Sequence, residues 1–411
     1  MADARHDYDI VIVGGGLVGA SLGVALAAGG LSAALLEAVP YGRPDQPSFD
    51  DRSVALGLGS KRIFEALGVW RRIPAVDAAP ILNIHISDRG RFGFARLDRR
   101  DLGVEALGYV VANRALGAAL AAALAESPAL TLIAPATLTA LDVAADGVRV
   151  GIDRNGRRET LTARLVVAAD GGDSTVRALA GIEARRTGYR QSALVANVGL
   201  ARDHAGTAYE RFTSSGPLAM LPMADRRCAV VWTLAPKAAE AAAALPDDAF
   251  LLKLQAAFGG RLGAFLRAGR RQVYPLALTR VRELTRARLA LIGNAAHTVH
   301  PVAGQGFNLG LRDVALLAEL LSAAHTAGRD PGDAALLADY AAQRRRDNLV
   351  VSGFTDGLVR VFSNDFLPLA VARNLGLIAV DLLPPLKRGL MRRTMGLAGR
   401  LPRLARGLPL R

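Results

Sequence analysis

Three glycines and an acid near the start of the chain have the spacing of a dinucleotide site. Gly14, Gly16 and Gly19 directly follow an apolar run, and Glu37 ends a second apolar run. This order predicts a strand, a tight turn, a helix and a second strand. The first glycine permits the turn, the second lets the backbone approach a pyrophosphate, and the third lets helix and strand pack closely. An acid about 20 residues further on accepts hydrogen bonds from the adenosine ribose, and its charge disfavours the 2′-phosphate of NADP.

A second glycine-rich loop, GNAAHTVHPVAGQGFNLGLRD, occupies residues 293–313. The apolar residues 289–292 before it predict a buried strand, and residues 314–321 after it predict a helix. At such a place the backbone comes close to a ligand. His297 and His300 are three residues apart, but no cysteine or acidic ligand set accompanies them, so we predict no metal site.

Two further motifs complete a recognisable pattern, DDRSVAL at residues 50–56 and LVVAADGGDSTVR at residues 165–177. With the N-terminal motif they resemble the flavin-dependent aromatic hydroxylases of the para-hydroxybenzoate hydroxylase type. The stretches HISDRG (85–90), ERFTSSGPLAMLPM (210–223) and YPLAL (274–278) are similar to the ubiquinone-biosynthesis branch that acts on 2-polyprenyl-6-methoxyphenol. The resemblance extends from about residue 8 to residue 400, and it decides for FAD where the first motif leaves FAD and NAD open.

The resemblance assigns the late loop to the flavin. Asn294 would bond the ribityl chain, where many relatives have aspartate, and it keeps an acceptor oxygen without the charge. Pro301 would pack near flavin and substrate and help to position the ring. The glycine-rich end of the loop would line the isoalloxazine with Gly304, Gln305, Gly306 and Asn308. A helix that begins near Gly306 would aim its positive end at the pyrimidine side of the flavin.

The resemblance also implies cofactor contacts from three other places. Arg52 would reach the flavin, and Arg114, at a helix start, would reach the pyrophosphate; a surface arginine is the alternative at either position. Asp170 and Gly171 follow the apolar strand 165–169, where an acid and a close-approach glycine suit contact with FAD. A plain turn at the end of the strand is the alternative for this pair.

The activity that the resemblance implies is insertion of one oxygen atom into a polyprenylated phenol through a flavin C4a-hydroperoxide. NAD(P)H or another donor would reduce the flavin, and O2 would be the co-substrate. We assign no catalytic base: His297 or His300 could deprotonate the phenol, or both could be hydrogen-bonded structure. The alternatives are hydroxylation at another ring position and a non-hydroxylating flavoprotein of the prenyl reductase type. A flavin-binding assembly subunit without turnover is the remaining alternative.

These motifs require an α/β chain. We predict a Rossmann-type FAD-binding domain, a mostly antiparallel β-sheet substrate domain and a C-terminal helical region. The FAD domain would be discontinuous, over residues 1–72, 100–182 and 274–345. The substrate domain would comprise residues 73–99 and 183–273, with a helix near 247–258, and residues 346–411 would form the helical region.

Composition bounds the setting of the protein. The chain has 411 residues, of which 51% are hydrophobic, and its single cysteine, Cys228, cannot form an internal disulfide. Residues 16–36 lack a charge, but their glycines divide them into loop, helix, turn and strand, so we predict no transmembrane helix. We expect no nucleic-acid partner.

The C-terminal tail carries much of the net charge of +14. Its leucines would lie on one helical face, with arginines roughly opposite, although Pro402 and Pro409 argue against one continuous helix. We expect this tail to hold the protein peripherally on the inner membrane from the cytoplasm, beside other ubiquinone-biosynthesis proteins; a merely solvated basic end is the alternative. The leucines are Leu390, Leu397, Leu401, Leu404 and Leu408, and the arginines are Arg388, Arg392 and Arg406.

Overall fold

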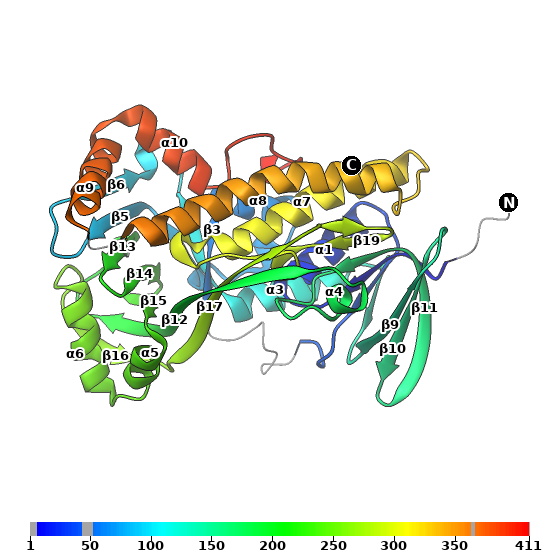
Figure 1. The fold of residues 1–411 in the computed structure, drawn as a ribbon, viewed down its shortest axis with the longest axis horizontal. Coiled ribbons are helices and arrows are strands. Elements are labelled where there is room, and N and C mark those ends of the chain that lie inside the picture. The colour runs from blue at the N-terminus through cyan, green and yellow to red at the C-terminus, as the bar shows by residue number, and fades with distance from the viewer. Residues whose placement is uncertain (1–5, 43–51, 363–365, 411) are drawn as a thin grey trace.

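The first apolar run forms the central strand of a mainly parallel sheet in the computed structural model, which describes residues 6–42, 52–362 and 366–410 (Figure 1). β1 (Tyr8–Val13) pairs in parallel with β2 (Ala33–Leu36) and β11 (Arg157–Ala168). Strands covered on both faces are apolar throughout, which explains their unbroken Val, Ile and Leu runs. The sheet also contains β8 (Leu130–Ile133), β9 (Thr137–Val143), β10 (Val148–Arg154), β18 (Thr285–Arg286) and β19 (Leu289–Leu291).

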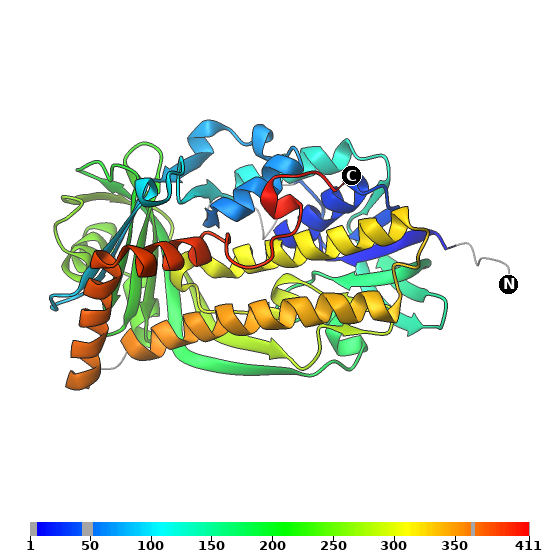
Figure 2. The same ribbon diagram turned by 90° about the horizontal axis from the view of Figure 1, so that it is seen from above.

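Helices cover this sheet and build the largest core of the described residues. α1 (Leu17–Ala28) packs against α3 (Asn113–Ala125) and against α7 (Gln305–Thr326). α7 lies beside the long α8 (Ala334–Phe362), as both ribbon views show (Figures 1 and 2). The shorter helices of this region are α2 (Leu58–Ala66) and α4 (Thr175–Leu179).

A small antiparallel sheet connects the two halves of the molecule. β7 (Gly108–Ala112) pairs with β3 (Ser53–Gly57) on one side and with β4 (Ala78–Ile81) on the other. β3 comes directly after the described chain resumes at Arg52, so the motif around this arginine enters the molecule on a strand. Asp50 and Asp51, which open that motif, lie outside the described residues.

The substrate domain is a nine-stranded sheet in which every pairing is antiparallel except that of β13 with β5. α5 (Pro236–Ala243) and α6 (Asp247–Phe258) pack on it. Sequence patterning predicted the second helix and missed the first. The strands are β5 (Asn83–Asp88), β6 (Phe94–Asp98), β12 (Ala184–Leu200), β13 (Thr207–Thr213), β14 (Gly216–Met223), β15 (Arg227–Leu234), β16 (Phe265–Ala268), β17 (Gln272–Val281) and β20 (His297–Thr298).

The two domains share strands at their boundary. β17 pairs with β12 as far as Val281, so the substrate sheet continues past residue 274, where we predicted the FAD domain to resume. β20, inside the late loop, pairs with β17 through Thr298. The late loop therefore belongs to both halves of the molecule. The buried Cys228 lies in the core of the substrate sheet, where burial raises the pKa of its thiol to about 12.

Two helices at the C-terminal side form an elbow at one end of the molecule (Figures 1 and 2). α9 (Leu367–Leu382) and α10 (Pro384–Thr394) meet at an angle of 95°. Among the described residues, no single helix is long and apolar enough to cross a membrane, whereas this bent pair together meets that length and composition.

The rest of the tail does not form the helix whose face we predicted. α10 ends at Thr394, and the chain continues as coil with one short 3₁₀ helix, Leu404–Arg406. Leu404 is buried in the core of the FAD domain, and Leu401 packs against that core. Pro402 and the glycines of this segment interrupt the helix, because proline removes a backbone donor and glycine is a poor helix former. The predicted α/β fold with a C-terminal helical region is confirmed; the single apolar face of the tail is wrong.

Candidate active site

The N-terminal glycine motif forms a turn that no larger residue fits. Gly14 has a φ of +104°, and a Cβ built there would lie 2.6 Å from the carbonyl oxygen of Ala169. A Cβ on Gly19 would lie 1.9 Å from the carbonyl oxygen of Gly14. Gly16 is the N-cap of α1 and lines the cavity described below. Gly14 and Gly19 thus have the turn and close-packing roles that their spacing indicates.

Glu37 lies at the edge of this turn, at the end of β2. Its Oε2 accepts a hydrogen bond from the backbone N–H of Gly15 at 2.7 Å, and its Oε1 accepts one from Val39 at 3.1 Å. The carboxylate is therefore held beside the glycine turn. That is the position from which an acid can reach a ribose bound on the N-terminus of α1.

A large cavity of about 940 Å³ joins the glycine turn to the substrate sheet. Two helix N-termini open into it. Gly16 and Leu17 of the α1 end and Gln305 and Gly306 of the α7 end line its wall. Neither helix has a side-chain cap or an acid in its first turn. Uncapped N-terminal N–H groups carry a partial positive charge and favour anionic groups.

Arg52 adds a full positive charge to the same cavity. Its guanidinium lies over the ring of Tyr274, 5.0 Å from the ring centroid, and both residues line the cavity. The backbone carbonyl of Arg52 accepts a hydrogen bond from the N–H of Asn113 at 2.8 Å. Arg52 thus contacts the start of α3 and a tyrosine of the substrate sheet at the cavity wall, and its contact with the flavin stays a prediction.

The late loop is held from behind by a buried carboxylate, Asp313. Its Oδ2 accepts hydrogen bonds from the Gly293 N–H at 2.9 Å and lies 2.8 Å from His297 Nε2. Its Oδ1 accepts a hydrogen bond from Arg344 Nε of α8 at 2.6 Å. Burial alone would raise the pKa of Asp313, but His297 and Arg344 hold that pKa below its ordinary value.

His300 is also buried, on the side of the loop away from the cavity. Its ring meets Tyr189 edge to face with centroids 5.1 Å apart, and its Nδ1 accepts from the Val302 N–H at 3.3 Å. Burial lowers the pKa of His300 to about 4, so the ring is neutral at pH 7. Neither His297 nor His300 lines the cavity. Both have structural contacts, and the geometry offers neither of them as the base for a phenol.

Asn308 joins the first turn of α7 to β3. Its amide nitrogen donates to the carbonyls of Ala55 and Gly304, at 2.8 and 2.7 Å. Its oxygen accepts from the Gly57 N–H at 2.8 Å and from the Ser60 hydroxyl at 2.7 Å. All four hydrogen-bonding positions of the amide are used within the protein. Asn308 therefore lines the cavity and also holds the start of α7 against β3 and α2.

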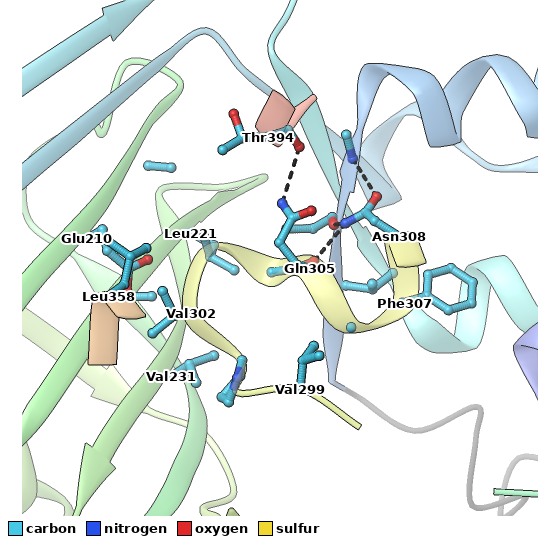
Figure 3. A pocket seen from close by; sticks show the side chains of 18 of the residues that line it. Glu210, Leu221, Val231, Val299, Val302, Gln305, Phe307, Asn308, Leu358 and Thr394 are labelled. Atoms are coloured by element: carbon cyan, nitrogen blue, oxygen red, sulfur yellow. Dashed lines mark hydrogen bonds between the residues drawn. The ribbon is translucent and has the colours of Figure 1, made fainter. Parts of the chain in front are cut away.

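Gln305 forms the neighbouring part of the wall (Figure 3). Its side-chain amide donates to the carbonyl of Thr394 at 3.2 Å, which joins the start of α7 to the end of α10. Gly304 has a φ of +61° and lies against Ala55. The end of the late loop is thus packed between β3 and the C-terminal helices, where it forms one side of the cavity.

The structure brings most of the predicted site residues to this cavity. Those that line it are Gly16, Arg52, Gly171, Asn294, Pro301, Gly304, Gln305, Gly306 and Asn308. Gly14, Gly19 and Glu37 form the turn beside it. Asp170 accepts a hydrogen bond from the Val176 N–H at 3.0 Å through one oxygen. Arg114 instead pairs with Asp77 at 2.6 Å, is largely exposed and does not line the cavity. Its contact with a pyrophosphate stays a prediction.

Among the polar lining residues that were not predicted from the sequence, three have side chains that bear on the site. Asn113, at the start of α3, lines the cavity in place of its neighbour Arg114. Glu210, on β13, is the one carboxylate among the described lining residues, and Arg373, on α9, lines the far end. A signal for Glu210 and Asn113 was present in the sequence, because Glu210 opens the stretch ERFTSSGPLAMLPM and Asn113 directly precedes Arg114. Which side chain faces inward is set by how the elements pack.

The cavity fits FAD. Two uncapped helix N-termini and Arg52 would hold the pyrophosphate and the pyrimidine side of the flavin, and Glu37 would hold the ribose. Asp170 Oδ1 is a buried carboxylate oxygen with no hydrogen-bond partner among the described residues, as expected where a cofactor donor completes the site. Asn294, exposed at the cavity wall, retains its amide for a ribityl hydroxyl.

A glycine turn on a parallel sheet, a second glycine loop and an antiparallel sheet over the cavity define the class of FAD-dependent aromatic monooxygenases. The FAD binding domain family matches residues 7–351. A solved structure, p-nitrophenol 4-monooxygenase PnpA from Pseudomonas putida, superposes with a TM-score of 0.79 over 96% of this chain and 98% of its own, at 20% identity. That likeness concerns the fold.

Sequence relatives identify the particular branch. Ubiquinone hydroxylase UbiL of Rhodospirillum rubrum is 44% identical over 98% of this chain and 93% of its own length. The 3-demethoxyubiquinol 3-hydroxylase of Escherichia coli is 33% identical over 95% of this chain and 98% of its own. The protein belongs to the ubiquinone-biosynthesis branch of the FAD-dependent aromatic hydroxylases, and the predicted family is confirmed.

Replacing Glu37 tests its place in the cofactor site. We expect Glu37→Ala to weaken FAD binding by about 10- to 100-fold, because charge-assisted hydrogen bonds contribute about 1.5–3 kcal/mol. Titration of the apoprotein with FAD, followed by flavin fluorescence, measures the change. Glu159→Gln, on an exposed part of β11, is the control and should bind FAD normally. Equal affinity in Glu37→Ala and the control would remove Glu37 from the site.

Replacing Asp313 tests the anchor of the late loop. Asp313→Asn keeps the shape but removes the charge beside buried Arg344, so the free energy of unfolding should fall by about 3–5 kcal/mol. The pKa of Asp313 is depressed in the folded protein. The ionised Asp313 therefore stabilises the folded state at pH values above the ordinary pKa of 3.8, and this stabilisation is lost as pH falls below that value. The variant should therefore lose less stability than the unmodified protein between about pH 4.5 and 3.

Urea unfolding at several pH values measures both effects. The control is Asp330→Asn, which removes a partly exposed partner of Arg288 at 2.7 Å and should cost about 1 kcal/mol or less. If the two variants lost the same small amount, Asp313 would not be the anchor that its contacts indicate.

Proposed function

We propose that the protein hydroxylates a polyprenylated phenol on the pathway to ubiquinone, and that this phenol is 2-polyprenyl-6-methoxyphenol. The observation that carries the proposal is the apolar half of the cavity. It extends from the late loop into the space between the substrate sheet and the C-terminal helices. Its walls there include Ile84, Ile86, Leu97, Leu221, Leu358 and Leu377. A ring that carries a long hydrocarbon chain matches walls of this kind.

The residues of the chain divide the work around the cofactor. Bound reduced flavin supplies the activation of O2, and the protein supplies binding, orientation and exclusion of water. Pro301 and Val302 present the late loop to the ring, and Asn308 keeps the loop packed on β3. The loop and the substrate sheet face each other across the cavity, so a bound phenol would be shielded from solvent between them.

Glu210 would serve this reaction as the acceptor for the phenol proton. It is the one carboxylate among the described residues of the cavity wall, which it shares with Leu221 and Leu358 (Figure 3). Removing a proton from the hydroxyl makes the ring more electron-rich and so more reactive toward an electrophilic oxygen. A carboxylate in an apolar cavity can accept that proton where bulk water is excluded.

The reaction would need an electron donor and O2, and it would take place at a membrane. NAD(P)H or another donor would reduce the flavin, and O2 would supply the inserted atom. The protein would work in the cytoplasm, peripherally on the inner membrane, where a polyprenylated phenol is dissolved. Other ubiquinone-biosynthesis proteins would supply and receive the intermediate.

Hydroxylation at another ring position is the second candidate. The similarity to 3-demethoxyubiquinol 3-hydroxylase, over nearly the whole of both chains, favours it. Both candidates use the same flavin site and the same apolar cavity. They differ in which ring carbon faces the flavin, and therefore in which phenol the protein consumes.

Mass spectrometry of quinone-pathway lipids in a strain that lacks the gene tests the function. We expect 2-polyprenyl-6-methoxyphenol to accumulate, because its hydroxylation would be blocked. Return of the unmodified gene should remove it. Accumulation of demethoxyubiquinol would assign the second candidate, and normal ubiquinone with no accumulated phenol would overturn the proposed pathway.

Replacing Glu210 tests the proton acceptor. Glu210→Gln should lower the hydroxylation rate by about 10²–10⁴-fold and leave FAD affinity unchanged, because a general base contributes about this much. The deficit should shrink as pH rises toward the phenol's own pKa of about 10, where solvent removes the proton. A deficit that is equal at every pH would assign Glu210 a packing role. Glu159→Gln again serves as the control.

A further inference from the structure

α9 exposes three leucines to solvent and buries two of its polar side chains. Leu367, Leu375 and Leu382 are 61%, 55% and 69% exposed, whereas Arg373 and Asn374 are 8% and 1% exposed. A helix on the surface of a water-soluble domain normally has the opposite arrangement. Contiguous exposed apolar surface of this kind marks a site of contact with another hydrophobic body.

Buried polar contacts fix this orientation of α9. Asp88 Oδ2 accepts hydrogen bonds from Arg373 Nε at 2.8 Å and from Asn374 Nδ2 at 3.0 Å. Asn374 Oδ1 in turn accepts from the Gly93 N–H at 2.7 Å. Rotating the helix to bury its leucines would leave these groups unpaired inside the protein, which is strongly unfavourable. The buried polar contacts therefore hold the exposed leucines in their outward orientation.

Aromatic and basic side chains border the leucines. The Gly93 contact brings the β5–β6 turn to α9, and on that turn Phe92 is 57% exposed and follows the exposed Arg89 and Arg91. α10 continues the surface with Leu386, which is 51% exposed, and carries the exposed Arg388, Arg392 and Arg393. Aromatic rings and cations around an apolar patch suit the boundary between hydrocarbon and anionic lipid headgroups.

The inner sides of the same helices line the active-site cavity. Leu358 and Phe362 of α8, Leu377 and Val380 of α9 and Leu390 of α10 are lining residues. The outer and inner surfaces of α9 are thus separated by the thickness of one helix. A hydrocarbon chain could pass between these helices from a bilayer to the flavin without crossing water.

The shape of this surface favours a bilayer over a second copy of the chain. α9 and α10 form a convex elbow at one end of the molecule (Figures 1 and 2). A convex elbow enters a soft lipid layer, whereas two identical convex surfaces have poor complementarity. The basic tail beyond α10 does not offer the apolar face, because Leu404 is buried and Leu401 packs on the FAD domain.

We propose that the outer face of α9, with Phe92 and the start of α10, inserts into an anionic lipid monolayer and opens the cavity to the polyprenyl chain between α8, α9 and α10. The membrane contact stands on the surface alone. The route for the chain rests on the proposed function.

The test compares two double variants of the full chain loaded with FAD. Leu367→Ser with Leu375→Ser removes two side chains from the α9 face. Leu252→Ser with Leu266→Ser removes two equally exposed leucines, at 72% and 59%, from α6 and β16. Flotation with vesicles of phosphatidylglycerol and phosphatidylethanolamine measures binding. We expect the partition coefficient of the α9 variant onto vesicles to fall by at least about tenfold, and that of the control to match the unmodified protein.

A second arm separates the membrane contact from the proposed reaction. Both variants are assayed with a short-chain, water-soluble phenol and with a polyprenylated phenol held in the same vesicles. We expect the α9 variant to keep the first activity and to lose at least about tenfold of the second. If the unmodified protein hydroxylates neither phenol, the proposed function fails, while flotation still decides the membrane contact.

Three outcomes would overturn the inference. The unmodified protein could stay out of the vesicle fraction, or both variants could bind as well as it does. Sedimentation equilibrium could instead show a dimer that only the α9 substitutions dissociate, which would assign the α9 face to a second copy of the chain. Equal flavin content and melting temperature in the variants exclude misfolding as the cause of lost binding.

Discussion

The geometry of the flavin site depends on one buried carboxylate. Asp313 lies on α7 and contacts the first residue of the late loop, a histidine of that loop and an arginine of α8. The charge is fully buried, so its partners must stay in place to compensate for lost hydration. Gly293, His297 and Arg344 are therefore held together, and the loop between them takes one path. That path brings the N-terminus of α7 to the cavity and turns both loop histidines away from it.

A second constraint acts at the other end of the cavity. Gly14 and Gly19 bring the first turn of α1 against β1 and β11, at distances that exclude any side chain. Both helix N-termini line one cavity, and Arg52 adds its charge to the same cavity. These positive groups would hold an anionic cofactor. The substrate sheet supplies apolar walls of the cavity.

Another part of the cavity is shaped by α9, which keeps Arg373, Asn374 and Leu377 inside and Leu367, Leu375 and Leu382 outside. The pair of Arg373 with Asp88 connects the helix to the substrate sheet in the way that Arg344 with Asp313 connects α8 to the late loop. Buried ion pairs thus fix both the cofactor side and the substrate side of one cavity. The rest of the cavity wall includes many apolar side chains, which suit a ring that carries a hydrocarbon chain.

The sequence by itself determined the family and the cofactor class, because several short motifs together resemble one family, and each motif is a pattern over a few neighbouring residues. It also indicated many of the residues that line the cavity. Gly14 and Glu37 lie where the glycine spacing indicates, and Arg52 and the late loop lie at the cavity where the resemblance implies them. Only the tertiary structure decided which side chains face inward: Asn113 lines the cavity and Arg114 does not, and Glu210 meets the apolar walls. It also decided that α9 turns Leu367, Leu375 and Leu382 outward and that the tail packs on the FAD domain. The orientations of these side chains depend on contacts between residues far apart in the chain, such as Asp88 with Arg373, and no local periodicity encodes such contacts.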